Sequence, residues 1–132
     1  MRPIGFPYKT YRGLACPVIP LALHGPHGWK HTEAYVDSGA SVSICTVGDA
    51  KRLGMEYETG AERFMTVGDG SLIPVYLHHL PIQIGAQRLN ATMGFSPRLG
   101  VGFHLLGRQD IFAHFDVTFS DARRLVIFKP HR

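Results

Sequence analysis

The segment over residues 62–85, ERFMTVGDGSLIPVYLHHLPIQIG, constrains the fold more than any other part of the 132-residue chain. Two runs rich in apolar and β-branched residues flank Gly68-Asp69-Gly70. Glycine and aspartate are typical of tight turns between strands, so the pattern predicts a long β-hairpin. Pro74 and Pro81 interrupt the second strand and have no amide hydrogen, so we expect both at edge or bulge positions.

The other segments also favour strands over helices. Apolar or alternating runs bounded by turn residues predict strands at 16–23, 29–37, 41–45, 88–96 and 103–107, and a closing hairpin over 116–130. A turn is expected at 25–28 and a loop at 97–102. Short amphipathic patterns predict helices over 47–54, which ends in glycine, and over 108–115. We therefore expect an all-β protein of about eight or nine strands with two short helices, closed into a barrel or packed as a sandwich.

The length and composition fit a single domain over residues 1–132. The chain has 15 glycines and 9 prolines, which favours a turn-rich β protein over a helical bundle. Residues 1–13 show no pattern typical of a strand or a helix. Two alternatives stay open for them, an arm at a subunit interface and a disordered segment.

The charge pattern does not indicate a nucleic-acid partner, although the formal net charge is +4. The basic residues are dispersed singly or in pairs, and the strand segment YLHHLPIQIG does not show aromatic and basic residues interleaved on one face. No segment reaches the length of a transmembrane helix, and the N-terminus lacks the long apolar stretch of a signal peptide. We expect no nucleic acid, no membrane partner and a cytoplasmic location.

Metal and disulfide chemistry lack their sequence patterns. Cys16 and Cys45 are too few for a disulfide framework. His24, His27 and His31 straddle the expected turn at 25–28, and no cysteine or carboxylate pattern completes a metal site around them. No metal and no other cofactor is therefore expected.

Asp37, within AYVDSGASVSI at 34–44, is the candidate catalytic residue. A strand is expected to end at Asp37, and Ser38, Gly39 and Ala40 provide a sharp turn with small side chains. The triplet Asp-Ser-Gly alone favours an ordinary turn, because these residues are common in turns. Hydrolysis of an amide by water needs one group that accepts a proton and another that donates one. Two carboxylates that share a single proton supply both, and small neighbouring side chains would let two such loops meet.

A second motif, Leu105-Leu106-Gly107-Arg108, lies within FHLLGRQDIF. The pair VDSGA and LLGR, with a glycine-bearing hairpin between them, resembles the retroviral-type aspartic proteases (retropepsins) and their single-domain cellular and bacterial relatives. The resemblance spans roughly residues 17–128. Several retroviral members carry, directly after the first motif, an acid that can pair with the arginine of the second. Here that position is Ser41, which leaves the role of Arg108 open.

The resemblance implies an acid-protease fold, namely a closed barrel with a flap hairpin and a ψ-shaped loop. It implies that Asp37 is the catalytic acid and that Ser38 locks two active-site loops together. The active-site loop would continue through Gly39 and Ala40, which form the floor beneath the substrate. The strand that passes through the ψ-shaped loop behind Asp37 would comprise Leu105, Leu106 and Gly107. The tip of the flap would comprise Val67, Gly68, Asp69, Gly70 and Ser71.

The chain contains one Asp-Ser-Gly motif, whereas the mechanism needs two carboxylates. The other candidate aspartates, Asp69, Asp110, Asp116 and Asp121, lack the small-residue context that follows Asp37, namely Ser-Gly-Ala. A protease that carries both catalytic motifs in one chain would need about double this length. We therefore predict a two-fold homodimer, an aspartic endopeptidase that cleaves extended peptide or protein substrates between two Asp37 carboxylates. The alternative is a non-catalytic module of the same fold that serves dimerisation or peptide binding.

Overall fold

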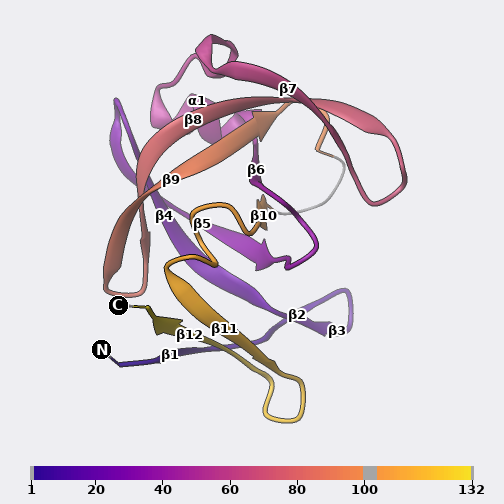
Figure 1. Ribbon diagram of the computed structural model, residues 1–132, viewed down its shortest axis with the longest axis vertical. Coiled ribbons are helices and arrows are strands. Elements are labelled where there is room, and N and C mark those ends of the chain that lie inside the picture. Colours follow the sequence, from indigo (N-terminus) through magenta and orange to yellow (C-terminus); the bar gives the residue numbers. More distant parts are fainter. Residues whose placement is uncertain (1, 100–103, 132) are drawn as a thin grey trace.

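The computed structural model describes residues 2–99 and 104–131, and these form twelve strands, one α-helix and one 3-10 helix. The largest sheet has seven strands (Figure 1). In hydrogen-bonded order they are β4 (Val18–Gly25), β5 (Gly28–Val36), β10 (His104–Leu106), β6 (Ser43–Thr46), β9 (Gln87–Ser96), β8 (Leu72–Ile84) and β7 (Ala61–Thr66). Because β4 also pairs with β8 through Ala22 and Leu23, the sheet curves back on itself.

Strand β10 lies between β5 and β6, which are neighbours in the sequence (Figure 1). It runs parallel to β5, with Leu106 opposite Val36, and antiparallel to β6, with Leu105 opposite Ile44. The connection from β5 to β6 therefore has to pass around the end of a strand from much later in the chain. This arrangement brings residues 37–42 and 104–109 together.

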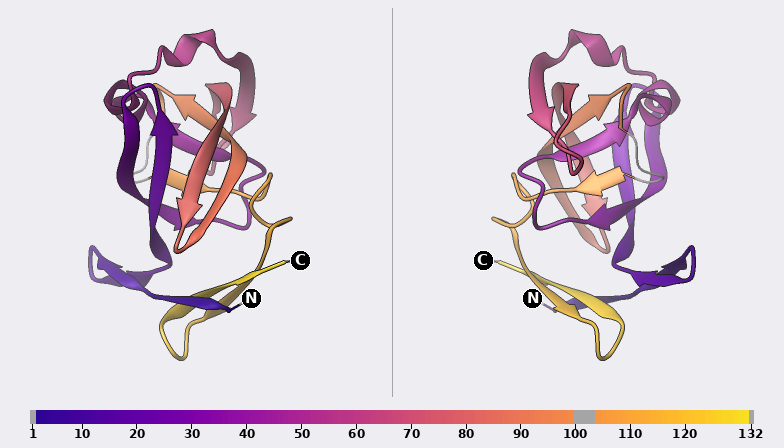
Figure 2. Two further views of the ribbon diagram at one scale, coloured as in Figure 1. Left: turned by 90° about the vertical axis from the view of Figure 1, so that its left-hand side faces the viewer. Right: turned by 90° about the vertical axis from the view of Figure 1, so that its right-hand side faces the viewer.

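A second, three-stranded antiparallel sheet contains both ends of the chain (Figure 2). Its order is β1 (Ile4–Pro7), β12 (Leu125–Pro130) and β11 (Phe115–Ser120), and the small hairpin of β2 (Lys9–Tyr11) and β3 (Leu14–Cys16) follows β1. The ring of Phe6 packs edge-on against that of Phe128, with centroids 5.8 Å apart. Within the segment 1–13, for which the sequence showed no strand pattern, residues 4–7 and 9–11 form strands, and β12 supplies β1 with a pairing edge and an apolar contact.

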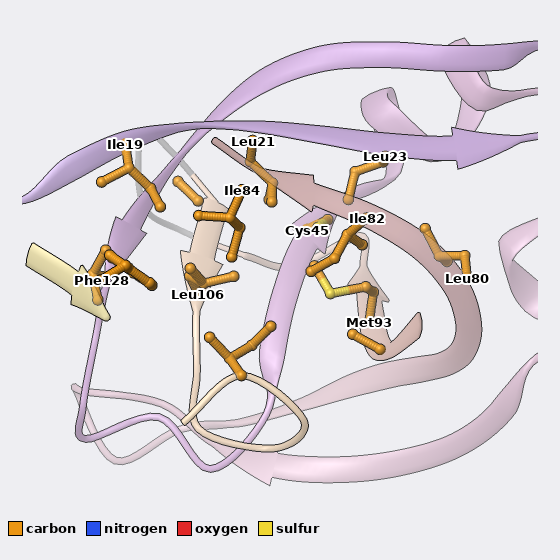
Figure 3. Packing of buried hydrophobic residues seen from close by; sticks show 14 of the residues in the cluster. Ile19, Leu21, Leu23, Cys45, Leu80, Ile82, Ile84, Met93, Leu106 and Phe128 are labelled. Carbon is orange, nitrogen blue, oxygen red and sulfur yellow. The ribbon is translucent and has the colours of Figure 1, made fainter. Parts of the chain in front are cut away.

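Alternating residues of the strands form the main core (Figure 3). Its largest fully buried side chains include Ile19, Leu21 and Leu23 of β4, Ile82 and Ile84 of β8, Met93 and Phe95 of β9, and Leu106 of β10. A smaller cluster, formed by Val42, Ile44, Ile73 and Val75, lies apart from the main core. Cys45 is fully buried, and its burial raises the pKa of its thiol.

One of the two predicted helices is present. The helix α1 (Val47–Leu53) ends at Gly54, whose φ of 76° gives the left-handed conformation of a glycine stop. The other helix of the structure is the 3-10 helix η1 (Tyr57–Thr59), which the sequence analysis did not predict.

The predicted helix over 108–115 is wrong, because this segment forms a series of turns. Asp110 has a φ of 64°, and its carboxylate accepts a hydrogen bond of 2.8 Å from the amide of Thr92 in β9. The amides of Arg108 and Gln109 donate to the carbonyls of Ala40 and Ser41. These contacts with other elements take the place of a regular helix.

The predicted strands and hairpins are confirmed to within a few residues at their ends. Pro74 lies opposite Phe64 of β7, before the pairing with β9 begins, and Pro81 lies opposite Asn90 of β9. In the strand pairing of the described residues, each proline therefore has a neighbouring strand on one side only, as an edge position requires. Residues 100–103, which include part of the predicted loop 97–102 and Phe103 of the predicted strand, lie outside the described residues.

The contact between Phe6 and Phe128 predicts that the N-terminal strand contributes to stability. We expect Phe6→Ala to lower the free energy of unfolding by about 2 kcal/mol, because a half-buried ring leaves its neighbours. Phe64→Ala is the matched control, since Phe64 is 65% exposed and its replacement should cost much less. Urea unfolding of both variants at one protein concentration measures the difference. Equal losses would contradict a packing role for β1.

Candidate active site

The loop that joins β5 to β6 begins at Asp37, directly after the last residue of β5. The amide of Asp37 donates to the carbonyl of Leu106 in β10, at 3.0 Å. Its carboxylate oxygen Oδ1 accepts a hydrogen bond of 2.9 Å from the amide of Gly39, and the amide of Ala40 donates to the Asp37 carbonyl. The Asp-Ser-Gly triplet thus forms a turn closed by its own carboxylate, and Asp37 itself is half-buried.

The segment after β10 holds the same loop from behind. The amides of Arg108 and Gln109 donate to the carbonyls of Ala40 and Ser41 at 2.9 and 3.0 Å. The amide of Gly107 donates to the buried hydroxyl of Ser43 at 2.9 Å. The loop is therefore held from both sides of Gly107. Leu106, before it, binds the amide of Asp37, and Arg108 and Gln109, after it, bind the carbonyls of Ala40 and Ser41.

Gly107 is required by the close approach of the two segments. A Cβ atom at this position would lie 2.5 Å from the carbonyl carbon of Val42 and 2.8 Å from the carbonyl oxygen of Ala40. Both are backbone atoms, which cannot rotate away as a flexible side chain could. The glycine of the second motif therefore has a steric explanation that does not depend on catalysis.

The Asp37 carboxylate borders a hollow of about 420 Å³, a size typical of ligand sites. Its lining includes Gly39 and Ala40 of the loop and Leu105 of β10. The β7–β8 hairpin contributes Met65, Thr66, Val67 and Gly68 to the lining. Val42 and Ile44 add apolar side chains to a lining that also contains Asp37, Ser41 and Thr66. The structure therefore brings the first motif, the second motif and the start of the hairpin turn together.

Several predicted site residues lie outside this hollow. Leu106 and Gly107 are buried beneath the loop, and Ser38 is exposed on its other side. The rest of the hairpin turn, Asp69, Gly70 and Ser71, is exposed and absent from the lining. The carboxylate of Asp69 accepts hydrogen bonds from the amide and the hydroxyl of Ser71, and these bonds lower the pKa of Asp69. Asp69 therefore closes its own turn.

A second hollow of about 390 Å³ lies on the Ser38 side of the loop. Tyr8, Tyr35, Phe119 and Asp121 belong to its lining, together with Asp37. The hydroxyl of Tyr8 donates to the Asp121 carboxylate at 2.8 Å, and burial together with this bond raises the pKa of Tyr8 to about 12. The sequence analysis missed this surface because it assigned no structure to the first 13 residues, where Tyr8 lies.

Comparison with known folds was informative where comparison of sequences was not. No family model and no curated protein matches the sequence. A retropepsin-like aspartic protease from Rickettsia conorii is similar over 96% of this chain and 98% of its own, with a TM-score of 0.69 and 18% identity. The chain has a retropepsin-like fold. EIAV protease in complex with the inhibitor HBY-793 is similar over 76% of this chain and 88% of its own, with a TM-score of 0.54 and 19% identity.

Within the retropepsin-like fold, the side chain of Arg108 is exposed. No acid lies within ion-pair distance of it among the described residues. Ser41, the residue directly after the first motif, is uncharged and cannot form such a pair. Its backbone amide still binds the active-site loop. In the described part of the chain, Arg108 thus supports the loop through its main chain.

The described residues contain no cluster of three or more histidine, cysteine, aspartate or glutamate side chains arranged to hold a metal ion. Over the same residues, no helix has the length and apolar character needed to span a membrane.

The packing around Gly107 predicts a large effect of a single methyl group. We expect Gly107→Ala to lower the free energy of unfolding by about 1–3 kcal/mol, because the new Cβ overlaps backbone atoms of the active-site loop. Gly5→Ala is the control, since no heavy atom lies within 4 Å of a Cβ there. Denaturant unfolding should show a change of about 0.5 kcal/mol or less for the control. A similarly small change for Gly107→Ala would mean that the two segments are not in close contact.

Proposed function

We propose that the protein is an aspartic endopeptidase that acts as a homodimer, with Asp37 of each chain as the catalytic pair. The observation that carries the proposal is the position of Asp37. Its carboxylate borders a hollow between the loop 37–42 and the β7–β8 hairpin, within a retropepsin-like fold. The fold alone would not establish an activity, so the proposal depends on this carboxylate and its small neighbours.

Two Asp37 carboxylates would share one proton, because like charges about 3 Å apart do not both ionise. The ionised carboxylate accepts a proton from a water molecule as the water oxygen attacks the peptide carbonyl carbon. The protonated carboxylate donates its proton to the carbonyl oxygen, which gives a tetrahedral diol. Transfer of a proton to the amide nitrogen and cleavage of the C–N bond then release two peptides. This water-based route uses neither a metal nor a covalent intermediate.

We infer that the second carboxylate comes from another chain, because the other candidate aspartates of this chain are bonded to groups other than Asp37. Asp69 binds Ser71, Asp110 binds the amide of Thr92, and Asp116 pairs with His131. Asp121 borders the second hollow but accepts a hydrogen bond from Tyr8. An isologous dimer with Asp37 on the two-fold axis supplies the missing group.

The substrate of this site would be an extended peptide. The β7–β8 hairpin corresponds to a flap, with β7 as an edge strand that offers backbone hydrogen bonds. The apolar lining by Val42, Ile44 and Met65 favours apolar substrate side chains. Closure of the hairpin turn, residues 67–71, would exclude water from the site.

Replacement of the carboxylate tests the catalytic role of Asp37. We expect Asp37→Asn to lower peptide cleavage at mildly acidic pH by about 10²–10⁴-fold, because an amide cannot exchange the proton. Asp116→Asn is the matched control, since the side chain of Asp116 is 63% exposed and lies on β11. A statine-type inhibitor should block wild-type cleavage.

Equal cleavage by the wild type and Asp37→Asn would remove Asp37 from the mechanism. Absence of cleavage in the wild type, with stable dimers in both proteins, would instead favour the non-catalytic binding module.

The Ser38 side of the loop is the surface that a second chain would cover. If two Asp37 residues meet on an axis, the second hollow beside Ser38 faces the partner. Phe119, which borders this hollow, is 40% exposed in the single chain. Aromatic side chains such as phenylalanine are enriched in protein interfaces, so Phe119 is the candidate contact on this surface.

Substitution at this surface tests the dimer. We expect Phe119→Arg to raise the dimer dissociation constant by about tenfold or more, because the guanidinium would replace an apolar contact. Glu58→Arg places the same side chain on η1 as a control. Sedimentation and specific activity across a dilution series measure the effect. A wild-type protein that stays monomeric at high concentration yet cleaves peptides would contradict the shared site.

A further inference from the structure

His104 is buried, at 7% exposure, and is the first residue of the three-residue strand β10. Successive side chains of a strand face opposite sides, so His104 points away from the hollow that Leu105 borders. His104 therefore contacts neither the hollow nor any substrate within it. A polar, titratable side chain in such a place needs hydrogen-bond partners, because burial without them is costly.

The imidazole contacts three elements other than its own strand. Its Nδ1 lies 3.1 Å from the carbonyl oxygen of Glu33 and 3.1 Å from the hydroxyl of Thr32, both in β5. Its Nε2 lies 3.3 Å from the hydroxyl of Thr46, at the end of β6, and 3.1 Å from the Oδ2 atom of Asp49 in α1. One side chain thus connects β10 with β5, β6 and α1.

Asp49 lies against the Nε2 side of this imidazole. It is 8% exposed, and its Oδ1 atom accepts a hydrogen bond of 2.9 Å from Arg52, which also donates to the carbonyl of His31. No described group donates a hydrogen bond to its Oδ2 atom, because the Nε2 atom of His104 is within ion-pair distance but outside hydrogen-bond geometry. The buried carboxylate is therefore compensated by Arg52 at Oδ1, whereas at Oδ2 it contacts His104, which offsets its charge only when the ring is protonated.

The hydroxyls of Thr32 and Thr46 can form hydrogen bonds with the imidazole in either of its charge states. Both ring nitrogens face oxygen atoms, which suits a doubly protonated imidazole. In the neutral ring, the hydroxyl of Thr32 or Thr46 can donate to the nitrogen that lacks a proton. Burial lowers the pKa of His104, Asp49 opposes this shift and Arg52 adds to it. The neutral ring therefore predominates at neutral pH.

We propose that His104 is a positioning residue that fixes β10 and thereby the backbone of Asp37. The inference rests on the proposed function for its catalytic consequence. A strand of three residues has few backbone hydrogen bonds, so a side chain that hydrogen-bonds to β5 and β6 and packs against α1 strongly restricts its position. Two residues beyond His104, the carbonyl of Leu106 accepts the hydrogen bond of the Asp37 amide. Displacement of β10 would therefore move the carboxylates that have to share a proton.

Hydrogen exchange tests the positioning role without any assay of activity. We expect His104→Leu to accelerate exchange of the Asp37 amide by about tenfold or more, because its bond to Leu106 opens locally. The Val36 amide, which donates to the carbonyl of Pro17, is the internal reference for global unfolding. His78→Gln is the matched control. It alters another imidazole, bonded to the carbonyl of Tyr57, on β8.

Kinetics test the catalytic consequence. We expect His104→Leu to lower kcat by about 10- to 100-fold and to leave KM nearly unchanged, since the hollow keeps its lining. His104→Gln, which restores hydrogen-bonding atoms, should recover part of kcat. His78→Gln should keep the wild-type kcat. Should His104→Leu fail to fold, the pair Thr32→Val and Thr46→Val removes hydroxyl partners and keeps the ring.

Stability adds a pH signature. Because the pKa of His104 lies below its ordinary value of 6.5, the unfolded chain binds the proton more readily. The stabilisation by the neutral ring is complete above about pH 6.5, falls as the pH drops from there toward the lower pKa of the folded protein, and is lost below it. The difference in unfolding free energy between wild type and His104→Leu should therefore become smaller as the pH decreases below about 6.5.

The outcomes separate the two proposals. Equal acceleration at Asp37 and Val36, or no acceleration, would overturn the positioning role whatever the activity. If His104→Leu accelerates exchange selectively at Asp37 while the wild-type protein cleaves no peptide, the positioning role is supported and the proposed function is refuted. Selective acceleration with an unchanged kcat would overturn the catalytic consequence of the inference.

Discussion

The hydrogen bond from the amide of Asp37 to the carbonyl of Leu106 joins the two segments on which the candidate site depends. It can form only because β10 lies between β5 and β6. The strand order places a late segment of the chain directly behind the turn that carries the carboxylate. Both motifs of the sequence thus meet through the backbone, and their side chains are free for other contacts.

This placement explains which residues the second motif requires. Leu105 faces the hollow, Leu106 faces the main core, and Gly107 leaves room for the carbonyls of the loop. Each of the three positions has a different physical constraint, although they are adjacent in sequence. Alternation along a strand explains the first two, and a Cβ distance of 2.5 Å explains the third.

The sequence predicted local structure better than long-range pairing. Turn residues and alternation located the β7–β8 hairpin, and the glycine stop located the end of α1. The turns over 108–115 were missed because the carboxylate of Asp110 binds the amide of Thr92, a contact between distant parts of the chain. The strand β1 was missed because its partner, β12, lies at the opposite end of the sequence. No local pattern could report either contact.

The candidate site shows the same division between local and distant contacts. Asp37 and its small neighbours could be found from the sequence, because the Asp-Ser-Gly turn is closed by its own carboxylate. The contacts of His104 could not, since its partners come from β5, β6 and α1. A turn alone leaves a carboxylate free to move, whereas a dyad needs two carboxylates held at a fixed separation despite their repulsion. The contacts of His104 with Thr32, Thr46 and Asp49 behind β10 supply such a restraint. A turn closed only by its own residues lacks one.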